Sequence, residues 1–275
     1  MKKLLLLLAV VLCVSAAAQA GAQVINYWDF DGVDQAADKA GTLSSGTVGS
    51  PSYGTTYSNP YTGSGDAFQQ ADGVWNNYVT AGAAGDVDFG TSSFSISFWY
   101  FDDAAASSDT RQMRVLDNRD GAGSGIVVGT TFTEINVALV DDAGNQAVGN
   151  LLHNDPDLGL FPAQQWVHVS ITVDRDTTDL ASVYVGGTLN HSFDISNLTG
   201  NIVGSDLLEI GVLNGGDHAG EVQAGALDDL AFYSGLLSSA EIEGLEAASI
   251  NPMNIPEPAT MVLLGLGALV LRRRK

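Results

Sequence analysis

Carboxylate side chains near the C-terminus are the residues of this sequence whose spacing most resembles a catalytic site. The segment 241–246 reads Glu-Ile-Glu-Gly-Leu-Glu. Two carboxyl groups about 5–5.5 Å apart hydrolyse glycosidic bonds with retention. However, Ser238 followed by Glu241 forms the capping box that begins a helix, and helical spacing turns Glu241 and Glu243 to different faces. We therefore predict a solvated helix surface here.

The four histidines form no recognisable metal or nucleophile motif. His168 alternates with apolar residues along a predicted strand, which favours a packed, hydrogen-bonded histidine over a general base. The other three, His153, His191 and His218, lack the spacing of a zinc site. The sequence also contains no Gly-x-Ser-x-Gly, P-loop or dinucleotide motif. No residue is assigned a catalytic role, and we predict that the protein is not an enzyme.

Aromatic residues in polar stretches are the candidates for sugar binding, because a flat ring can stack on a pyranose. Trp75 and Tyr78 lie beside Asn76 and Asn77, whose amides could hydrogen-bond sugar hydroxyls. Similar stretches contain Tyr53, Tyr57 and Tyr61. Packing within a loop is the alternative role for each of these residues. We take Trp75 and Tyr78 as the candidate ligand-binding pair.

The N-terminus has the three parts of a secretory signal peptide. Two lysines precede an unbroken apolar run at 4–14, and Ala18-Gln19-Ala20 fits the small-x-small cleavage rule. We predict a signal peptide at 1–20 with cleavage after Ala20, and cleavage after Ala22 fits nearly as well. The only cysteine, Cys13, lies within the apolar run, so the mature chain would contain no disulfide and no thiolate metal ligand.

The C-terminus has a motif, an apolar run and a basic end, in that order. Pro256-Glu257-Pro258 precedes a run at 259–271 that is apolar or glycine apart from Thr260, and four basic residues at 272–275. The run would span about 20 Å as a helix, which is shorter than a hydrocarbon core of about 30 Å. The positive-inside rule places the basic end in the cytoplasm. A generic membrane anchor is one interpretation of this tail.

This ending resembles the PEP-CTERM sorting signal. The resemblance implies recognition by an exosortase-type membrane protease, and either surface display or an exopolysaccharide matrix as the setting. The tail would then anchor the chain in the membrane through a C-terminal helix, either transiently or stably. The segment 249–258 is the spacer that joins it to the domain.

Removing both ends makes the rest of the chain strongly acidic. The formal net charge of the whole chain is −21, and six of its 11 lysines and arginines lie in the two ends. Such a charge keeps a domain soluble and repels nucleic acid and anionic membranes. It also suits divalent cations as partners. We therefore predict no nucleic-acid partner.

The region 23–248 is β-rich throughout. Residues 94–101 and 166–173 alternate between apolar and other side chains with a period of two, which is typical of strands with one buried face. Further strand candidates lie at 24–30, 113–118, 125–131, 135–140, 181–185, 189–195, 207–212 and 226–233. Short strands separated by Gly, Asp, Asn and Ser clusters indicate an all-β, two-sheet antiparallel jelly-roll sandwich, followed by one short helix.

Several of these segments resemble LamG-like domains of the concanavalin A-like superfamily. The matching segments are Tyr27-Trp28-Asp29-Phe30-Asp31-Gly32, 94–100, 166–169 with 183–187, and 227–233 with 237–242. The resemblance implies a jelly roll used for binding, adhesion or spacing. Glucanases of the same superfamily carry Glu-x-Asp-x-x-Glu on a strand, which 241–246 mimics with a Glu at the central position.

The resemblance also implies calcium, which many such domains hold. Calcium needs six to eight oxygen ligands. Asp31 on the first strand and Asp228 on the last would lie side by side if these strands are neighbours. We predict a structural Ca²⁺ at this pair, and two solvated aspartates are the alternative.

Together these features predict an exported, surface-sorted, non-enzymatic LamG-like module that binds carbohydrate or matrix, or mediates adhesion. An exosortase-type protease and a polysaccharide or exopolysaccharide matrix are the expected partners. A glycoside hydrolase-like enzyme of the same fold and a purely structural matrix protein are the alternatives.

Overall fold

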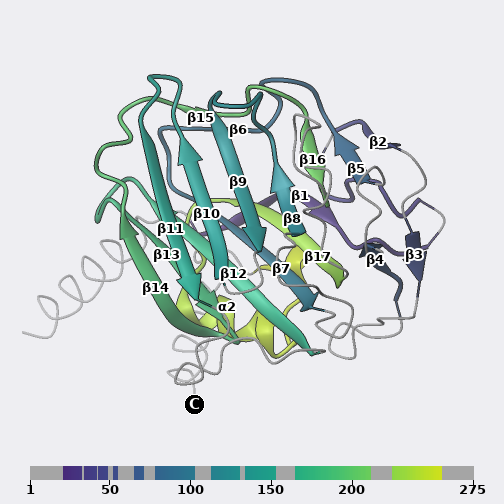
Figure 1. Cartoon of the computed structure of the whole chain (residues 1–275). Helices are drawn as coiled ribbons and strands as arrows, with labels where there is room; N and C mark the ends of the chain where they lie inside the picture. Colours follow the sequence, from purple (N-terminus) through teal and green to yellow (C-terminus); the bar gives the residue numbers. More distant parts are fainter. Residues whose placement is uncertain are drawn as a thin grey trace, which may run out of the picture.

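Two antiparallel sheets, packed face to face, form the body of the protein in a computed structural model (Figure 1). The structure describes residues 21–32, 34–41, 43–48, 52–54, 65–70, 78–102, 113–130, 134–152, 165–211 and 225–255. The predicted all-β jelly roll with one short C-terminal helix is confirmed.

The first sheet has eight strands and contains both the first and the last strand of the chain. Its order is β14 (Thr188–Asp194), β13 (Leu180–Val185), β12 (Trp166–Asp174), β7 (Phe94–Asp102), β17 (Gly225–Ser234), β4 (Ala67–Gln70) and β3 (Ser52–Gly54), and β1 (Gln23–Trp28) also pairs with β17.

The second sheet has seven strands and forms the opposite layer. Its order is β11 (Gln146–Leu152), β10 (Glu134–Val140), β9 (Gly125–Thr130), β8 (Met113–Asp117), β16 (Leu208–Ile210), β5 (Tyr78–Ala81) and β2 (Ser45–Val48). A small third sheet pairs β6 (Asp88–Gly90) with β15 (Ile202–Val203).

The core lies between the two large sheets and follows from the period-two alternation of their strands. Phe94, Ile96 and Phe98 of β7 point into it and are at most 1% exposed. Burying each side chain of this size contributes about 1.5–3 kcal/mol. The intervening residues of β7, which include Ser97 and Trp99, therefore face the outer side of the eight-stranded sheet.

The last strand, β17, changes partner halfway along one edge. Residues 225–227 pair with β4, and residues 230–234 pair with β1. Between them the register with β7 shifts, and Asp229 has a left-handed φ of 50°. The first and last strands are thus neighbours, as the calcium prediction required.

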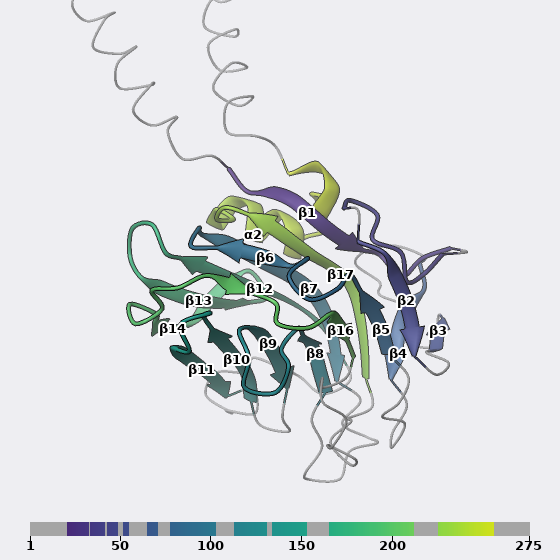
Figure 2. The ribbon, with the colours of Figure 1, turned by 90° about the horizontal axis from the view of Figure 1, so that it is seen from above.

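A short helix and a 3₁₀ turn cover the outer side of the eight-stranded sheet. The helix, α2 (Ser239–Glu246), begins with the predicted capping box, in which Ser238 and Glu241 bond reciprocally. Glu241 therefore serves as a helix cap, which confirms the helical interpretation of 241–246. The 3₁₀ turn η1 (Pro252–Asn254) follows. Figure 2 shows α2 and β1 on the side away from the seven-stranded sheet.

The two described ends of the chain lie together. Ala22, before β1, and Ile255, after η1, belong to one apolar cluster on this outer side. The predicted cleavage site at Ala18 and Ala20, and the motif Pro256-Glu257-Pro258, lie outside the described residues. Within the described segments, every helix is too short or too polar to cross a membrane.

Candidate functional site

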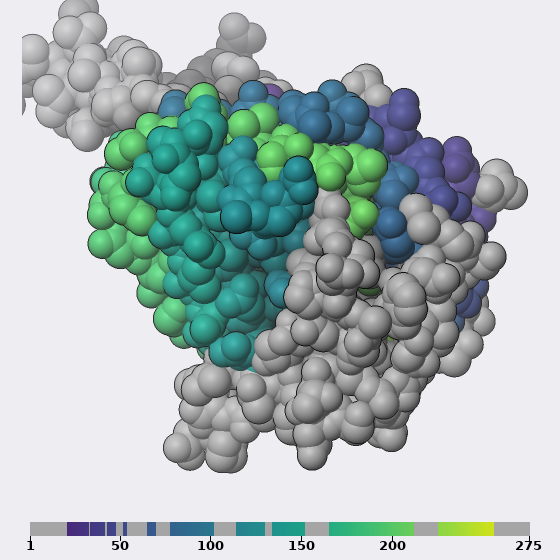
Figure 3. Space-filling view, turned by 45° about the horizontal axis from the view of Figure 1, so that its top comes forward, coloured from purple at the N-terminus to yellow at the C-terminus, as the bar shows by residue number. Residues whose placement is uncertain are grey.

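The outward face of the seven-stranded sheet carries a row of polar side chains across its centre. The strand register places Thr80 opposite Glu209, Glu209 opposite Asp117, and Asp117 opposite Val127. Their strand neighbours Val79, Ile210 and Leu116 point into the core. Because side chains alternate along a strand, Thr80, Glu209 and Asp117 share the face opposite the core. Figure 3 shows part of this layer, with β10 and β11 in teal.

Glu209 is buried although it lies on this outward face. It is 7% exposed, and its Oε2 has no hydrogen-bond partner within the described structure. The Tyr78 hydroxyl donates a hydrogen bond to this carboxylate. Burial raises the pKa of Glu209 to about 7, and the nearby charges of Asp117 and Asp206 add to the rise. Glu209 thus has one buried carboxylate oxygen without a hydrogen-bond partner among the described residues, and its raised pKa of about 7 lies near neutral pH.

Asp117 is the cross-strand partner of Glu209 and is also buried, at 2% exposed. Its Oδ1 accepts a hydrogen bond from the backbone N–H of Arg119 at 3.0 Å and lies 3.6 Å from Arg119 Nε. Burial raises the pKa of Asp117 to about 6, although the contacts with Arg119 and the charge of Arg114 act in the opposite direction. Asp117 is thus paired with an arginine, whereas Glu209 is paired with the hydroxyl of a tyrosine.

A second polar row runs beside the carboxylates. Arg114 crosses over Gly129, where a Cβ would lie only 2.9 Å from the arginine Cδ and Nη1. The glycine therefore leaves the space in which the arginine side chain lies. Farther along the face, the Asn136 amide donates to the Asn150 Oδ1 at 2.5 Å. This row presents amide and guanidinium donors beside the carboxylate acceptors.

We name Tyr78, Arg114, Asp117 and Glu209 the front site. It combines an aromatic ring, a guanidinium and two buried carboxyl groups on adjacent strands. Such a set can hydrogen-bond the hydroxyls of a sugar, which are both donors and acceptors. Directly opposed strand residues have Cβ atoms about 4.5–5.5 Å apart, and the charge of Asp117 acts on Glu209, so the two carboxyl groups are neighbours.

Of the sugar-binding candidates, Tyr78 lies in the front site, whereas Trp75 and its neighbours Asn76 and Asn77 lie outside the described residues. The role assigned to Tyr78 stays a prediction. Tyr53 is partly buried and packs against the core instead.

Of the calcium candidates, Asp31 lies after the end of β1 and not on that strand, and Asp228 lies in β17. Asp31 accepts a hydrogen bond from the Asp66 N–H at 2.5 Å, and Asp228, 4% exposed, accepts one from the Asp229 N–H at 2.9 Å. In the described part of the chain, no group of three or more His, Cys, Asp or Glu side chains could hold a metal ion. The calcium site therefore stays a prediction.

His168 lies on the outer side of the eight-stranded sheet, away from the front site. It is 3% exposed, which agrees with the predicted packed position. The expected hydrogen bond is missing at its Nδ1, which has no partner within the described structure. The strand period predicted the buried position of this residue, whereas the elements that pack around it come from distant parts of the sequence.

The sequence interpretation missed Asp117, Glu209 and Arg114. A signal was available, because Glu209 interrupts an apolar strand as Leu207-Leu208-Glu209-Ile210 and Asp117 ends another. A charged residue at an alternate position of a short apolar strand indicates a special environment on that face. Only the pairing of β16 with β8 shows that the two carboxylates meet.

Comparisons with known proteins agree with this fold. The profile described as the concanavalin A-like lectin/glucanases superfamily matches residues 72–243, and the PEP-CTERM protein-sorting motif matches 254–275. Solved structures with a similar fold include the binding domain of Paraclostridial Mosquitocidal Protein 1, with a TM-score of 0.60, 17% identity and coverage of 83% of this chain and 52% of that one.

Two botulinum neurotoxin domains are also similar. The serotype D ligand binding domain, solved in complex with N-acetylneuraminic acid, has a TM-score of 0.64 at 15% identity, and the serotype G binding domain has 0.64 at 17%. Each comparison covers 82% of this chain and 50% of the toxin domain, so the chain spans about half the length of these structures. At this identity the likeness concerns the fold alone.

No curated protein sequence matches the chain. The sequence profile covers more than half of its length, and the two-sheet jelly roll agrees with it. The chain therefore belongs to the concanavalin A-like lectin/glucanase superfamily and ends in a PEP-CTERM sorting motif.

Proposed function

We propose that this protein is a non-enzymatic module, displayed outside the cell, that binds a polysaccharide through the front site. The observation that carries the proposal is the carboxylate of Glu209, which is buried, held by Tyr78 and left with an oxygen that has no hydrogen-bond partner among the described residues. A buried acceptor of this kind is costly unless a ligand or water hydrogen-bonds to it. Sugar hydroxyls supply such donors.

The net charge of the protein limits the class of polysaccharide that it can bind. The net charge of −21 repels strongly anionic polymers. Burial raises the pKa of both carboxyl groups of the front site, so they lose part of their charge near neutral pH. We expect a neutral or amino-substituted polysaccharide of an extracellular matrix.

The position of the chain ends supports display with the seven-stranded sheet turned away from the attachment. Ile255, at the start of the matched sorting motif at 254–275, packs on the outer side of the eight-stranded sheet. The front site lies on the opposite layer. A chain held by its C-terminal tail, before or after processing by an exosortase-type protease, would thus direct the front site away from its attachment. Signal-peptide cleavage after Ala20 and membrane anchoring by the tail belong to this proposal.

Binding of the full chain to a panel of neutral, amino-substituted and anionic polysaccharides tests the proposal. We expect saturable binding to one neutral or amino-substituted polymer. Glu209→Gln and Tyr78→Phe should each weaken it about tenfold, because a hydrogen bond to a charged group contributes about 1.5–3 kcal/mol. Leu189→Ala, at a residue 52% exposed on β14 of the other sheet, is the matched control and should bind normally. Equal binding by all three variants would contradict the proposal that the polysaccharide binds at the front site.

A glycoside hydrolase is the second candidate, and the pairing of Asp117 with Glu209 favours it. A carboxyl group with a pKa of about 7, such as Glu209, is suited to act as a general acid at neutral pH. The test is release of reducing sugar ends from the bound polysaccharide. Release by the unmodified protein and its loss in Glu209→Gln would establish the enzyme and replace the non-enzymatic proposal.

A further inference from the structure

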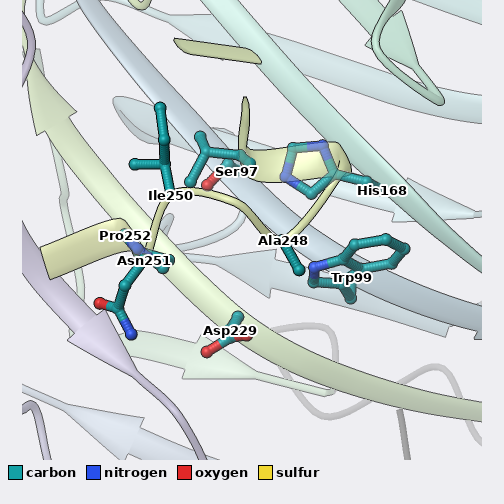
Figure 4. Close-up of a pocket in the computed structure, with 9 residues that line it drawn as sticks. Ser97, Trp99, His168, Asp229, Ala248, Ile250, Asn251 and Pro252 are labelled. Atoms are coloured by element: carbon teal, nitrogen blue, oxygen red, sulfur yellow. The ribbon is translucent and has the colours of Figure 1, made fainter. Parts of the chain in front are cut away.

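A cavity lies between the outer side of the eight-stranded sheet and the C-terminal segment of the domain. Its volume is about 100 Å³. The sheet side is formed by Ser97 and Trp99 of β7, His168 of β12 and Asp229 of β17 (Figure 4). The other side is formed by Leu245, Ala248, Ile250, Asn251 and Pro252. We name this cavity the back pocket.

His168 gives the back pocket an uncharged imidazole. The side chain is 3% exposed, and its Nδ1 has no hydrogen-bond partner among the described residues. Burial lowers the pKa of His168 to about 3, so the ring is neutral at physiological pH. A neutral imidazole has one nitrogen that accepts a hydrogen bond. Figure 4 shows this ring and the indole of Trp99 beside the same space, and their centroids are 5.2 Å apart.

Asp229 gives the back pocket its negative charge. The residue is 9% exposed, and the Tyr27 hydroxyl donates a hydrogen bond to its Oδ1. Burial raises the pKa of Asp229 to about 6, which still leaves mainly the carboxylate at neutral pH. The charges of Asp29 and Asp31 act on the same group. Among the described lining residues there is no lysine or arginine, so an anion would meet repulsion in this pocket.

The remaining lining combines an aromatic face with small apolar groups. An indole attracts a cation near its ring face. The Ser97 hydroxyl pairs with the Tyr233 hydroxyl at 3.2 Å and keeps acceptor capacity for a further partner. Leu245, Ile250 and Pro252 offer apolar contact to a short alkyl chain. A cavity of about 150 Å³ can hold a benzene molecule, so this smaller one fits a ligand of a few heavy atoms.

We propose that the back pocket binds a small primary ammonium compound. The ammonium group has three donors, and three of the residues that line the cavity, Asp229, His168 and Ser97, have side chains that can accept a hydrogen bond. Trp99 contributes its ring, and the C-terminal segment contacts the alkyl part. An isosteric alcohol could meet the same acceptors but lacks the charge that pairs with the carboxylate. This site is separate from the front site, so it does not depend on the polysaccharide proposal.

Backbone hydrogen bonds hold the C-terminal side of the back pocket in place. The backbone N–H groups of Ser249 and Ile250 both donate to the Gly244 carbonyl, at 2.9 and 3.1 Å. Ala248, between them and the helix, has a left-handed φ of 50°. This side of the back pocket lies immediately before the sorting motif at 254–275. A bound amine would therefore contact both the sheet and the segment that leads to the tail.

Ligand-observed saturation-transfer NMR on the full chain at pH 7.5 tests the proposal with three probes of similar size: ethylammonium, ethanol and acetate. We expect saturable binding of ethylammonium with a Kd on the order of 1 mM, because tiny ligands gain at most about 1.5 kcal/mol per heavy atom. Ethanol should bind about tenfold more weakly, and acetate should not bind. Failure of ethylammonium to saturate, or equal affinity for ethanol, would overturn the assignment.

Two variants test whether ethylammonium binds in the back pocket. Asp229→Asn removes the charge, and asparagine tolerates the left-handed backbone at this position. His168→Phe removes the imidazole acceptor but keeps an aromatic ring. Each should weaken ethylammonium binding about tenfold, whereas Glu209→Gln in the front site should leave it unchanged. Unchanged binding in both back-pocket variants would refute the proposal, and loss in Glu209→Gln alone would move the amine to the front site.

Discussion

Replacing Glu209 with glutamine tests whether this carboxylate is desolvated as the structure implies. Burial raises the pKa of Glu209 from 4.5 to about 7. The folded state therefore binds more protons than the unfolded state between these values, and the carboxylate costs stability as the pH rises through them. The full shift would correspond to about 3.4 kcal/mol. Solvent screening at a residue on an outward face reduces our expectation to about 1–2 kcal/mol.

Glu209→Gln should therefore unfold with a higher free energy than the unmodified protein at pH 8.5, and with nearly the same free energy at pH 5. Urea denaturation followed by tryptophan fluorescence measures both values. Glu243→Gln, on the exposed side of α2, is the matched control because it removes the same charge at the surface. Surface substitutions of this kind change stability by less than about 0.5 kcal/mol. A Glu209→Gln variant whose gain is the same at both pH values, or that is destabilised at both, would refute the reasoning.

Three further changes test other parts of the structure. A Cβ built on Gly149 of β11 would overlap the ring of Phe193, so Gly149→Ala should lower the free energy of unfolding by about 1–3 kcal/mol in urea. Ser238→Ala removes the N-cap of α2 and should cost about 1 kcal/mol in the same assay, whereas Ser238→Asp should retain most of it. If Asp31 and Asp228 bind calcium, added Ca²⁺ should raise the melting temperature and a chelator should lower it, and the absence of both shifts would count against that prediction.

Local sequence patterns predicted the elements whose signals lie within a few residues. The alternation in 94–101 and 166–173 identified β7 and β12, because a strand with one buried face repeats every two residues. The capping box at Ser238 identified the start of α2 for a similarly local reason. β11 was not predicted, since Gly149 interrupts its pattern. That glycine is explained by Phe193, which comes from a strand of the other sheet.

The sequence by itself determined the β-rich class, the strongly acidic domain and the motif at the C-terminus, all of which depend on composition or on neighbouring residues. The tertiary structure alone decided which distant side chains meet. Asp117 and Glu209 become partners only because β8 lies beside β16. Likewise, His168, Asp229 and Ile250 line one cavity only because the C-terminal segment folds back over the outer sheet. Strand order depends on contacts between segments far apart in sequence, and no local period records such contacts.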